Sequence, residues 1–173
     1  MIDTGILLIR VVVGLYVAAH GAQKLFGWFS GPGLDATVDI MGGATGLRPA
    51  RLWVPFISAS ELVGGLLMAI GFLGPLGPIA VAGAMLGATV FGHWSHGPWN
   101  ANGGYELAAT NLSAALAVAL IGVGRFSVDA WLGVQVPGLV SEVFGLLVVI
   151  GVLAAGFGRR LQPSHVHRPP LMR

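Results

Sequence analysis

The chain has 173 residues, of which 55% are hydrophobic and 9% charged, and its formal net charge is +2. Because an ordinary soluble domain carries roughly 25% charged residues, nine basic and seven acidic side chains are too few to cover the surface of a soluble protein of this length. The absence of cysteine excludes disulfide frameworks, thiolate metal sites, iron–sulfur clusters and dithiol redox chemistry. We therefore expect an all-α membrane protein in which any redox role depends on a borrowed cofactor.

Five apolar segments approach or exceed the roughly 20 residues that a helix needs to cross a hydrocarbon core about 30 Å thick. They run over residues 5–28, 53–73, 78–94, 105–124 and 136–157. The first follows Asp3 and contains Arg10, a pattern unlike a cleaved signal peptide, so we expect it to be retained as a helix. Glycine and proline over residues 71–78 predict a tight hairpin, and residues 97–104 predict a polar break.

Two shorter features concern helix termini. The first loop contains a pattern typical of a short interfacial helix over residues 35–41, with Asp35 as the N-cap and Gly42 and Gly43 as the stop. In the last span, Glu142 follows Pro137 closely, which predicts a carboxylate at a helix N-terminus.

The predicted domain organisation follows from these spans. We expect a four-helix membrane domain over residues 1–129, an additional C-terminal transmembrane helix over residues 130–158 and a basic cytoplasmic tail over residues 159–173. Four of the nine basic residues lie in the last fifteen positions, a distribution typical of a juxtamembrane tail, and we expect no nucleic-acid partner.

The arginines predict the orientation in the membrane. If all five segments cross, six arginines share one face, namely Arg48, Arg51, Arg159, Arg160, Arg168 and Arg173. Arg125 alone lies in the loops on the opposite face. The positive-inside rule then predicts an external N-terminus and a cytoplasmic C-terminus. We expect an integral protein of the bacterial inner membrane.

The 28 glycines predict close helix packing. Average usage is near 7%, or about 12 glycines in a chain of this length. Gly83 and Gly87 form a small-xxx-small pair in the third span, a pattern that lets membrane helices approach closely. We expect these glycines to serve packing only.

Ionisable residues inside the spans are the main functional signal. Each costs about 2.5–3.5 kcal/mol at the bilayer centre on insertion scales, so it needs a partner or water. Five of them are predicted at a similar depth on four helices, namely His20, Lys24, Glu61, His93 and Glu106. Arg10 shares a broad face with His20 but lies roughly 15 Å from it along the helix, at about 1.5 Å per residue, and needs a separate partner. We predict a hydrated polar pocket that opens toward the cytoplasmic face.

A structural alternative stands beside this pocket. A Lys24–Glu61 or His93–Glu106 pair would simply fix helix register, and Lys24 and His93 are near enough to their helix ends to snorkel. Trp94 is a candidate for the pocket mouth or, alternatively, an interfacial anchor.

Several segments resemble the DoxX family of membrane proteins. The first is RVVVGLYVAAHGAQKLFGWF over residues 10–29, with its arginine followed by His-Gly and Lys-Leu-Phe-Gly motifs. The resemblance continues in SELVGGLLMAIGFLGPLG from residue 60, in HWSHGPWNANGGYELA from residue 93, and in the Gly-x-Gly-Arg-Phe-Ser-x-Asp segment that ends at Asp129.

The resemblance implies a four-helix bundle and a loose association with redox chemistry, because the family includes the membrane component of thiosulfate:quinone oxidoreductase. The ionisable residues at the matching motif positions are the same ones that the predicted spans place inside the membrane, namely Arg10, His20, Lys24, Glu61, His93 and Glu106. The fifth span departs from the family pattern and leaves the topology and oligomeric contacts open.

Our leading functional hypothesis is a redox-associated component that binds a quinone headgroup. The candidate catalytic residues are Glu61, Glu106 and His93, where the carboxylates relay protons. The candidate cofactor-binding residues are Arg10, His20, Lys24 and Trp94. Membrane lipids, and a redox protein or a second copy of the chain, are the expected partners.

Two alternatives belong to other classes. His20, His93, Glu61 and Glu106 form a nitrogen and oxygen set that suits zinc, iron or copper, although the Glu-x-x-His repeat of di-iron bundles is absent. The other alternative is a non-catalytic accessory subunit that anchors a larger complex.

Overall fold

The helices follow the predicted apolar segments. The computed structural model describes residues 1–160 and contains no strand in that range. Its α-helices are α1 (Ile2–Phe26), α2 (Gly33–Ala44), α3 (Ala50–Ile70), α4 (Leu76–Gly87), α5 (Glu106–Ile121), α6 (Val128–Leu132) and α7 (Gly138–Arg160). A π-helical turn, Ala88–His93, prolongs α4, and short 3-10 turns cover Trp28–Ser30, Trp94–His96 and Asn100–Asn102.

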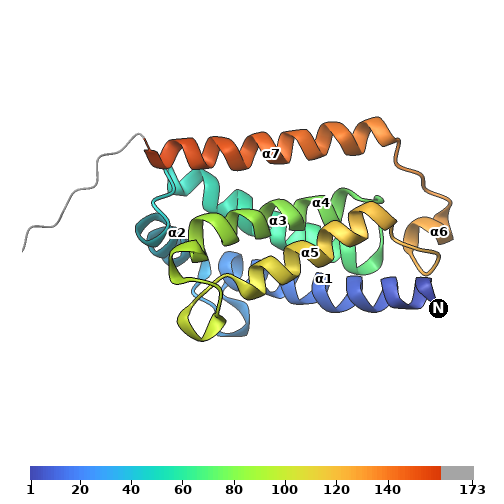
Figure 1. Cartoon of the computed structure of the whole chain (residues 1–173), viewed down its shortest axis with the longest axis horizontal. Helices are drawn as coiled ribbons and strands as arrows, with labels where there is room; N and C mark the ends of the chain where they lie inside the picture. Colours follow the sequence, from blue (N-terminus) through green and yellow to red (C-terminus); the bar gives the residue numbers. More distant parts are fainter. Residues whose placement is uncertain (161–173) are drawn as a thin grey trace, which may run out of the picture.

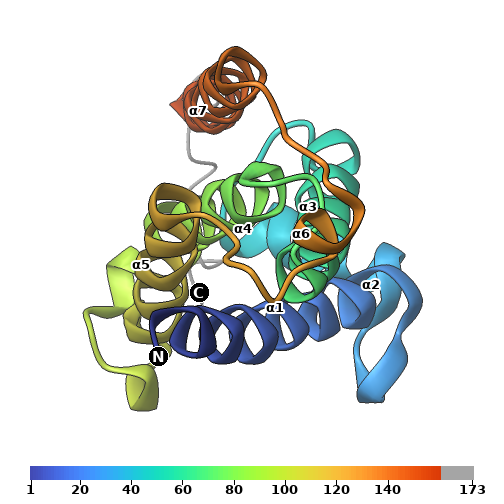
Figure 2. The same ribbon diagram turned by 90° about the vertical axis from the view of Figure 1, so that its right-hand side faces the viewer.

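Four of the long helices form a bundle, and α7 lies outside it (Figure 1). The closest packing is between α1 and α3, and α4 packs against both α3 and α5. In the end-on view α7 lies on the outer side of α4, with α1 on the opposite side of the bundle (Figure 2). The prediction of a four-helix bundle with an additional C-terminal helix is therefore confirmed.

Glycine makes the α1–α3 contact possible. A Cβ at Gly14 would lie 2.6 Å from the Gly65 carbonyl oxygen, and a Cβ at Gly21 would collide with the Leu62 amide. Buried valine, methionine and alanine side chains such as Val17, Met68 and Ala115 fill the centre of the bundle. Small residues thus replace the large core residues of soluble proteins at the helix crossings.

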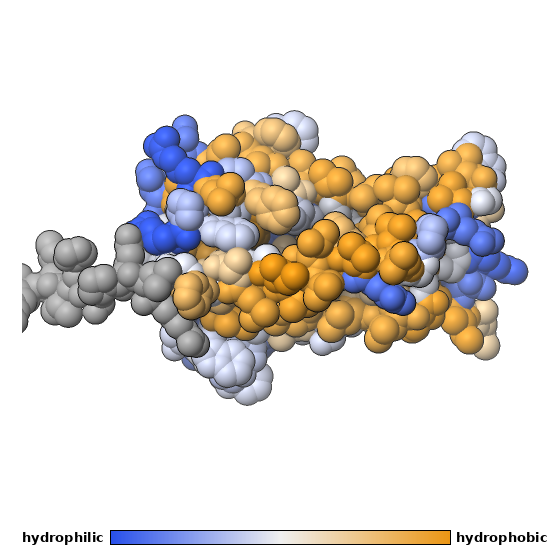
Figure 3. Space-filling view, turned by 90° about the horizontal axis from the view of Figure 1, so that it is seen from above, coloured by the Kyte–Doolittle hydropathy of each residue, from blue (hydrophilic) through white to orange (hydrophobic). Residues whose placement is uncertain are grey.

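The outer surface is apolar along its length. Figure 3 shows a mostly hydrophobic face with hydrophilic patches gathered mainly toward the two ends. Within residues 1–160, four helices are long and apolar enough to cross a membrane: α1, α3, α4 with its π-helical extension, and α7. The predicted span at residues 105–124 is instead the shorter α5, of 16 residues. The chain is an integral membrane protein, and the direction in which it crosses stays a prediction.

The predicted helix termini require two corrections. Helix α2 begins before Asp35, with Pro32 at the N-cap, and it continues through Gly42 and Gly43 to Ala44. The left-handed residue that follows the helix is Gly46, with φ 68°, so Gly46 is the effective stop signal. Glu142 is exposed and lies beyond the first turn of α7, which contains no acidic residue.

The hairpin prediction over residues 71–78 is confirmed. Helix α3 ends at Gly71, whose φ of 68° is in the left-handed region that favours glycine, and α4 begins at Leu76. At the other terminus, α7 runs to Arg160, and the predicted basic tail beyond it lies outside the described residues.

Candidate functional site

An ion pair joins α1 to α3 near the end of α1. Lys24 Nζ donates to both oxygens of Glu61, at 2.6 and 2.7 Å. The Glu61 side chain is 1% exposed, whereas that of Lys24 is 24% exposed. The carboxylate is therefore enclosed by the bundle, and the ammonium forms the side of the pair that is reached from outside.

Two polar aromatic side chains, Tyr16 and His20, lie on the same side of α1 as Lys24. Tyr16, His20 and Lys24 are spaced four residues apart, which places them on one stripe of the helix. The Tyr16 and His20 rings meet edge to face, with centroids 4.8 Å apart. His20 also interacts electrostatically with Glu61 and Lys24. We call Tyr16, His20 and Lys24 the α1 polar face.

The α1 polar face has unused hydrogen-bonding capacity. Neither the His20 ring nor the Tyr16 hydroxyl forms a hydrogen bond with any residue from 1 to 160. The two rings contact each other only edge to face. An ammonium has three donors, and Glu61 accepts from Lys24 in two contacts. Tyr16 is 46% exposed and His20 is half-buried. The α1 polar face is therefore partly exposed, and residues 1–160 do not fill its hydrogen-bonding capacity.

His93, Trp94 and Glu106 form a separate cluster where α4 leads into α5. His93 Nδ1 is 2.7 Å from the Gly103 carbonyl oxygen. Trp94 stacks on Tyr105 with centroids 5.1 Å apart, immediately before Glu106. Glu106 is half-buried, and its carboxylate forms no ion pair with another described residue. These contacts stabilise the polar segment that connects the π-helical extension of α4 to α5.

Arg10 lies toward the opposite end of α1 and is 1% exposed. It donates through Nη2 to the Phe126 carbonyl oxygen, and it interacts electrostatically with Asp129. The two Asp129 oxygens accept from the Leu73 and Gly74 amides at 3.0 and 2.6 Å. Arg10 thus has the separate partner that its depth predicted.

Glycine is required beside this arginine. A Cβ at Gly71 would collide with Arg10 Nη1. The guanidinium therefore lies directly against the end of α3 and ties α1 to the hairpin and to the loop before α6. Arg10 borders a cavity of about 530 Å³ with Arg125 and Trp131.

The predicted site residues fall into two bonded groups. Lys24, Glu61 and His20 come together, but no hydrogen bond or ion pair in the described part of the chain joins them to His93, Trp94 or Glu106. Across residues 1–160, no three histidine, aspartate or glutamate side chains are close enough to hold a metal ion. The proposed metal set of His20, His93, Glu61 and Glu106 is therefore not assembled in the described residues.

Tyr16 was not among the predicted site residues. Its spacing of four from His20 is the signal that would have found it, because residues i and i+4 are neighbours on a helix surface. Asp129 was noted only within a motif, and its role beside Arg10 depends on a contact across more than a hundred residues.

Comparison with known families agrees with this architecture. A family model described as DoxX matches residues 5–94, which is just over half of the 173 residues. The match runs from α1 to the end of α4 and its π-helical extension, and includes Arg10, the α1 polar face and Glu61. No curated protein and no solved structure matches significantly. The chain therefore belongs to the DoxX family of helical membrane proteins.

Proposed function

We propose that this chain is the membrane component of a redox system, and that the α1 polar face, with Glu61 behind it, binds the headgroup of a membrane quinone. The observation that carries the proposal is the set of unused donors at membrane depth beside a buried carboxylate. Polar groups in such a position are costly and typically functional.

The chemistry of the site matches the ligand class. The carbonyl oxygens of a quinone accept hydrogen bonds, and Lys24, neutral His20 and Tyr16 can each donate one. The stripe lies on the outside of α1, so a quinone would reach it laterally from the bilayer. The redox role itself comes from the resemblance to the DoxX family, and the electrons would come from a redox protein partner or a soluble donor.

Glu61 has a distinct part in this proposal. Reduction of a quinone to a quinol takes up two electrons and two protons, so a bound headgroup needs a nearby group that holds protons. Glu61 contacts Lys24 directly, and His20 interacts electrostatically with both residues. We propose that Glu61 and His20 hold protons for the headgroup while Lys24 orients it. His93, Trp94 and Glu106 remain outside the proposed site.

The test is a binding titration of the purified protein in mild detergent with a decyl-tailed benzoquinone. We expect His20→Ala and Glu61→Gln each to weaken binding at least about tenfold, equivalent to about 1.4 kcal/mol. His96→Ala and Glu106→Gln are the matched controls, because they change the same residue types outside the α1 polar face. Unchanged binding in Glu61→Gln and His20→Ala would contradict the proposal and favour the accessory-subunit alternative, in which the ion pair only fixes helix register.

A further inference from the structure

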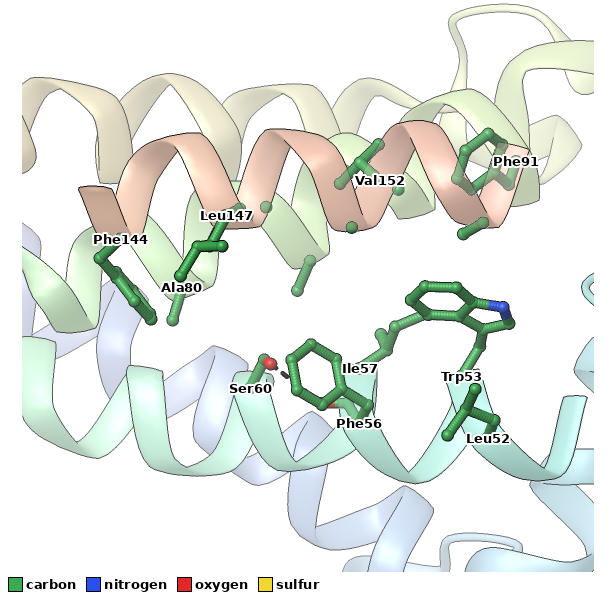
Figure 4. Close-up of a pocket in the computed structure, with 16 residues that line it drawn as sticks. Leu52, Trp53, Phe56, Ile57, Ser60, Ala80, Phe91, Phe144, Leu147 and Val152 are labelled. Carbon is green, nitrogen blue, oxygen red and sulfur yellow. Dashed lines mark hydrogen bonds between the residues drawn. The ribbon is translucent and has the colours of Figure 1, made fainter. Parts of the chain in front are cut away.

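An apolar groove lies between α7 and the bundle, away from the α1 polar face. Its volume is about 360 Å³, and its walls come from α3, α4 and α7 (Figure 4). Phe144 and Ala80 mark one end, whereas Trp53 and Phe91 mark the other (Figure 4). We propose that this groove is a binding site for one acyl chain of a membrane phospholipid.

The groove exists because α7 touches the bundle at few places. Gly83 of α4 lies directly against Val148, and a Cβ at Gly83 would collide with that side chain. Near the end of α7, Gly156 lies against the Phe91 ring. Among residues 138–158, only Ala155 is buried. Close contact with α4 thus leaves the space between α7 and α3 unfilled by protein.

The length of the groove matches one leaflet. Its walls include residues from 80 to 91, in α4 and its π-helical extension, and residues from 144 to 155 of α7. Eleven residue steps at about 1.5 Å each give a length of about 16 Å, close to half of a hydrocarbon core about 30 Å thick. The segment that contains α4, Leu76–His96, and α7 are each long and apolar enough to cross a membrane, so the groove runs along the direction expected for lipid chains.

The side chains that line the groove suit an apolar chain with an ester group at one end. The Ser60 hydroxyl donates to the Phe56 carbonyl oxygen at 2.9 Å and has no need of a ligand. The Trp53 indole N–H forms no hydrogen bond with any described residue. Trp53 is in the first turn of α3, at the depth where indole rings meet the headgroup region. Its N–H is placed to donate to the ester carbonyl of a lipid whose chain fills the groove.

Two glycines on α7 allow one substitution that fills the groove with a side chain and one control substitution that does not. A Cβ at Gly151 or at Gly145 meets no atom within 4 Å, so a larger side chain is tolerated at both positions. Gly151 lines the groove and Gly145 does not. Gly151→Leu should therefore occupy the groove, whereas Gly145→Leu adds the same side chain to α7 at a position outside the groove lining.

The experiment counts phospholipids on the intact protein by native mass spectrometry after delipidation and re-addition of dioleoyl phosphatidylcholine. We expect the wild type and Gly145→Leu to retain one lipid and Gly151→Leu to retain none. Equal retention by Gly151→Leu and Gly145→Leu would overturn the proposal. So would a dimer that forms without retained lipid and is lost in Gly151→Leu, or a quinone recovered in place of phospholipid.

A second arm tests the hydrogen bond. The diether analogue of the same lipid lacks the ester carbonyl, so the wild type should retain it less than the ester lipid. Trp53→Phe keeps an aromatic ring but removes the N–H, and it should retain the two lipids equally. A preference for the ester lipid that persists in Trp53→Phe would overturn the assigned role of Trp53.

Discussion

The two halves of α1 carry buried charge in different ways. Toward its start, Arg10 is 1% exposed and lies against the α3–α4 hairpin and the loop before α6. Toward its end, Lys24 is 24% exposed and pairs with a carboxylate that is 1% exposed. The first arrangement is enclosed by protein, and Arg10 Nε and Nη1 have no hydrogen-bond partner among the described residues. The second leaves its donors partly exposed. We therefore expect buried Arg10 to stabilise the fold and partly exposed Lys24 to be available to a ligand.

The largest loss of stability is expected at the closed end. Arg10→Met removes the donor to the Phe126 carbonyl oxygen and leaves Asp129 without its nearby cation. Removing one member of a buried charged set costs about 3–5 kcal/mol, and we expect a loss near the lower value in a detergent unfolding titration. Arg125→Met is the control, because its ion pair with Asp3 is largely exposed. Equal stability of the two variants would show that Arg10 does not tie these elements together.

The half-open ion pair should show an intermediate loss. Lys24→Met leaves the Glu61 carboxylate buried without its donor, and we expect a loss of about 2 kcal/mol, because hydrogen bonds to charged groups contribute about 1.5–3 kcal/mol. The double variant Lys24→Met, Glu61→Met removes both charges and should be more stable than Lys24→Met alone. A double variant whose loss equals the sum of the two single losses would mean that the residues do not interact.

The smallest effect on stability is expected at His20. Its ring forms no hydrogen bond that holds one described element to another, so His20→Ala should cost about 0.5 kcal/mol or less. The same variant should lose quinone binding, which separates ligand recognition from folding. A stability loss as large as that of Lys24→Met would instead assign His20 a structural role.

Hydropathy and turn residues were sufficient to predict the long helices, but not α6 or the bounds of α2. The depth of the charged residues was sufficient to predict that Lys24, Glu61 and Arg10 need partners. Lys24–Glu61 and the separate partner of Arg10 both follow from that reasoning. Depth does not specify which helices are neighbours. Glu61 and Glu106 were expected in one pocket because both approach the same end of the bundle, but Glu61 pairs with α1, whereas Glu106 begins α5, which packs mainly on α4 and less on α1. The groove beneath α7 depends on tertiary packing and left no signal in the sequence beyond Gly83 and Gly151.

The position of the quinone headgroup is tested by photoaffinity labelling of the protein in membranes with an azido-quinone, followed by peptide mapping. Our account predicts labels concentrated on residues 16–24 and on α3 around Glu61, with competition by unmodified quinone and loss of these labels in His20→Ala. Labels that are absent from residues 16–24, or that persist unchanged in His20→Ala and in excess quinone, would contradict a headgroup site on the α1 polar face.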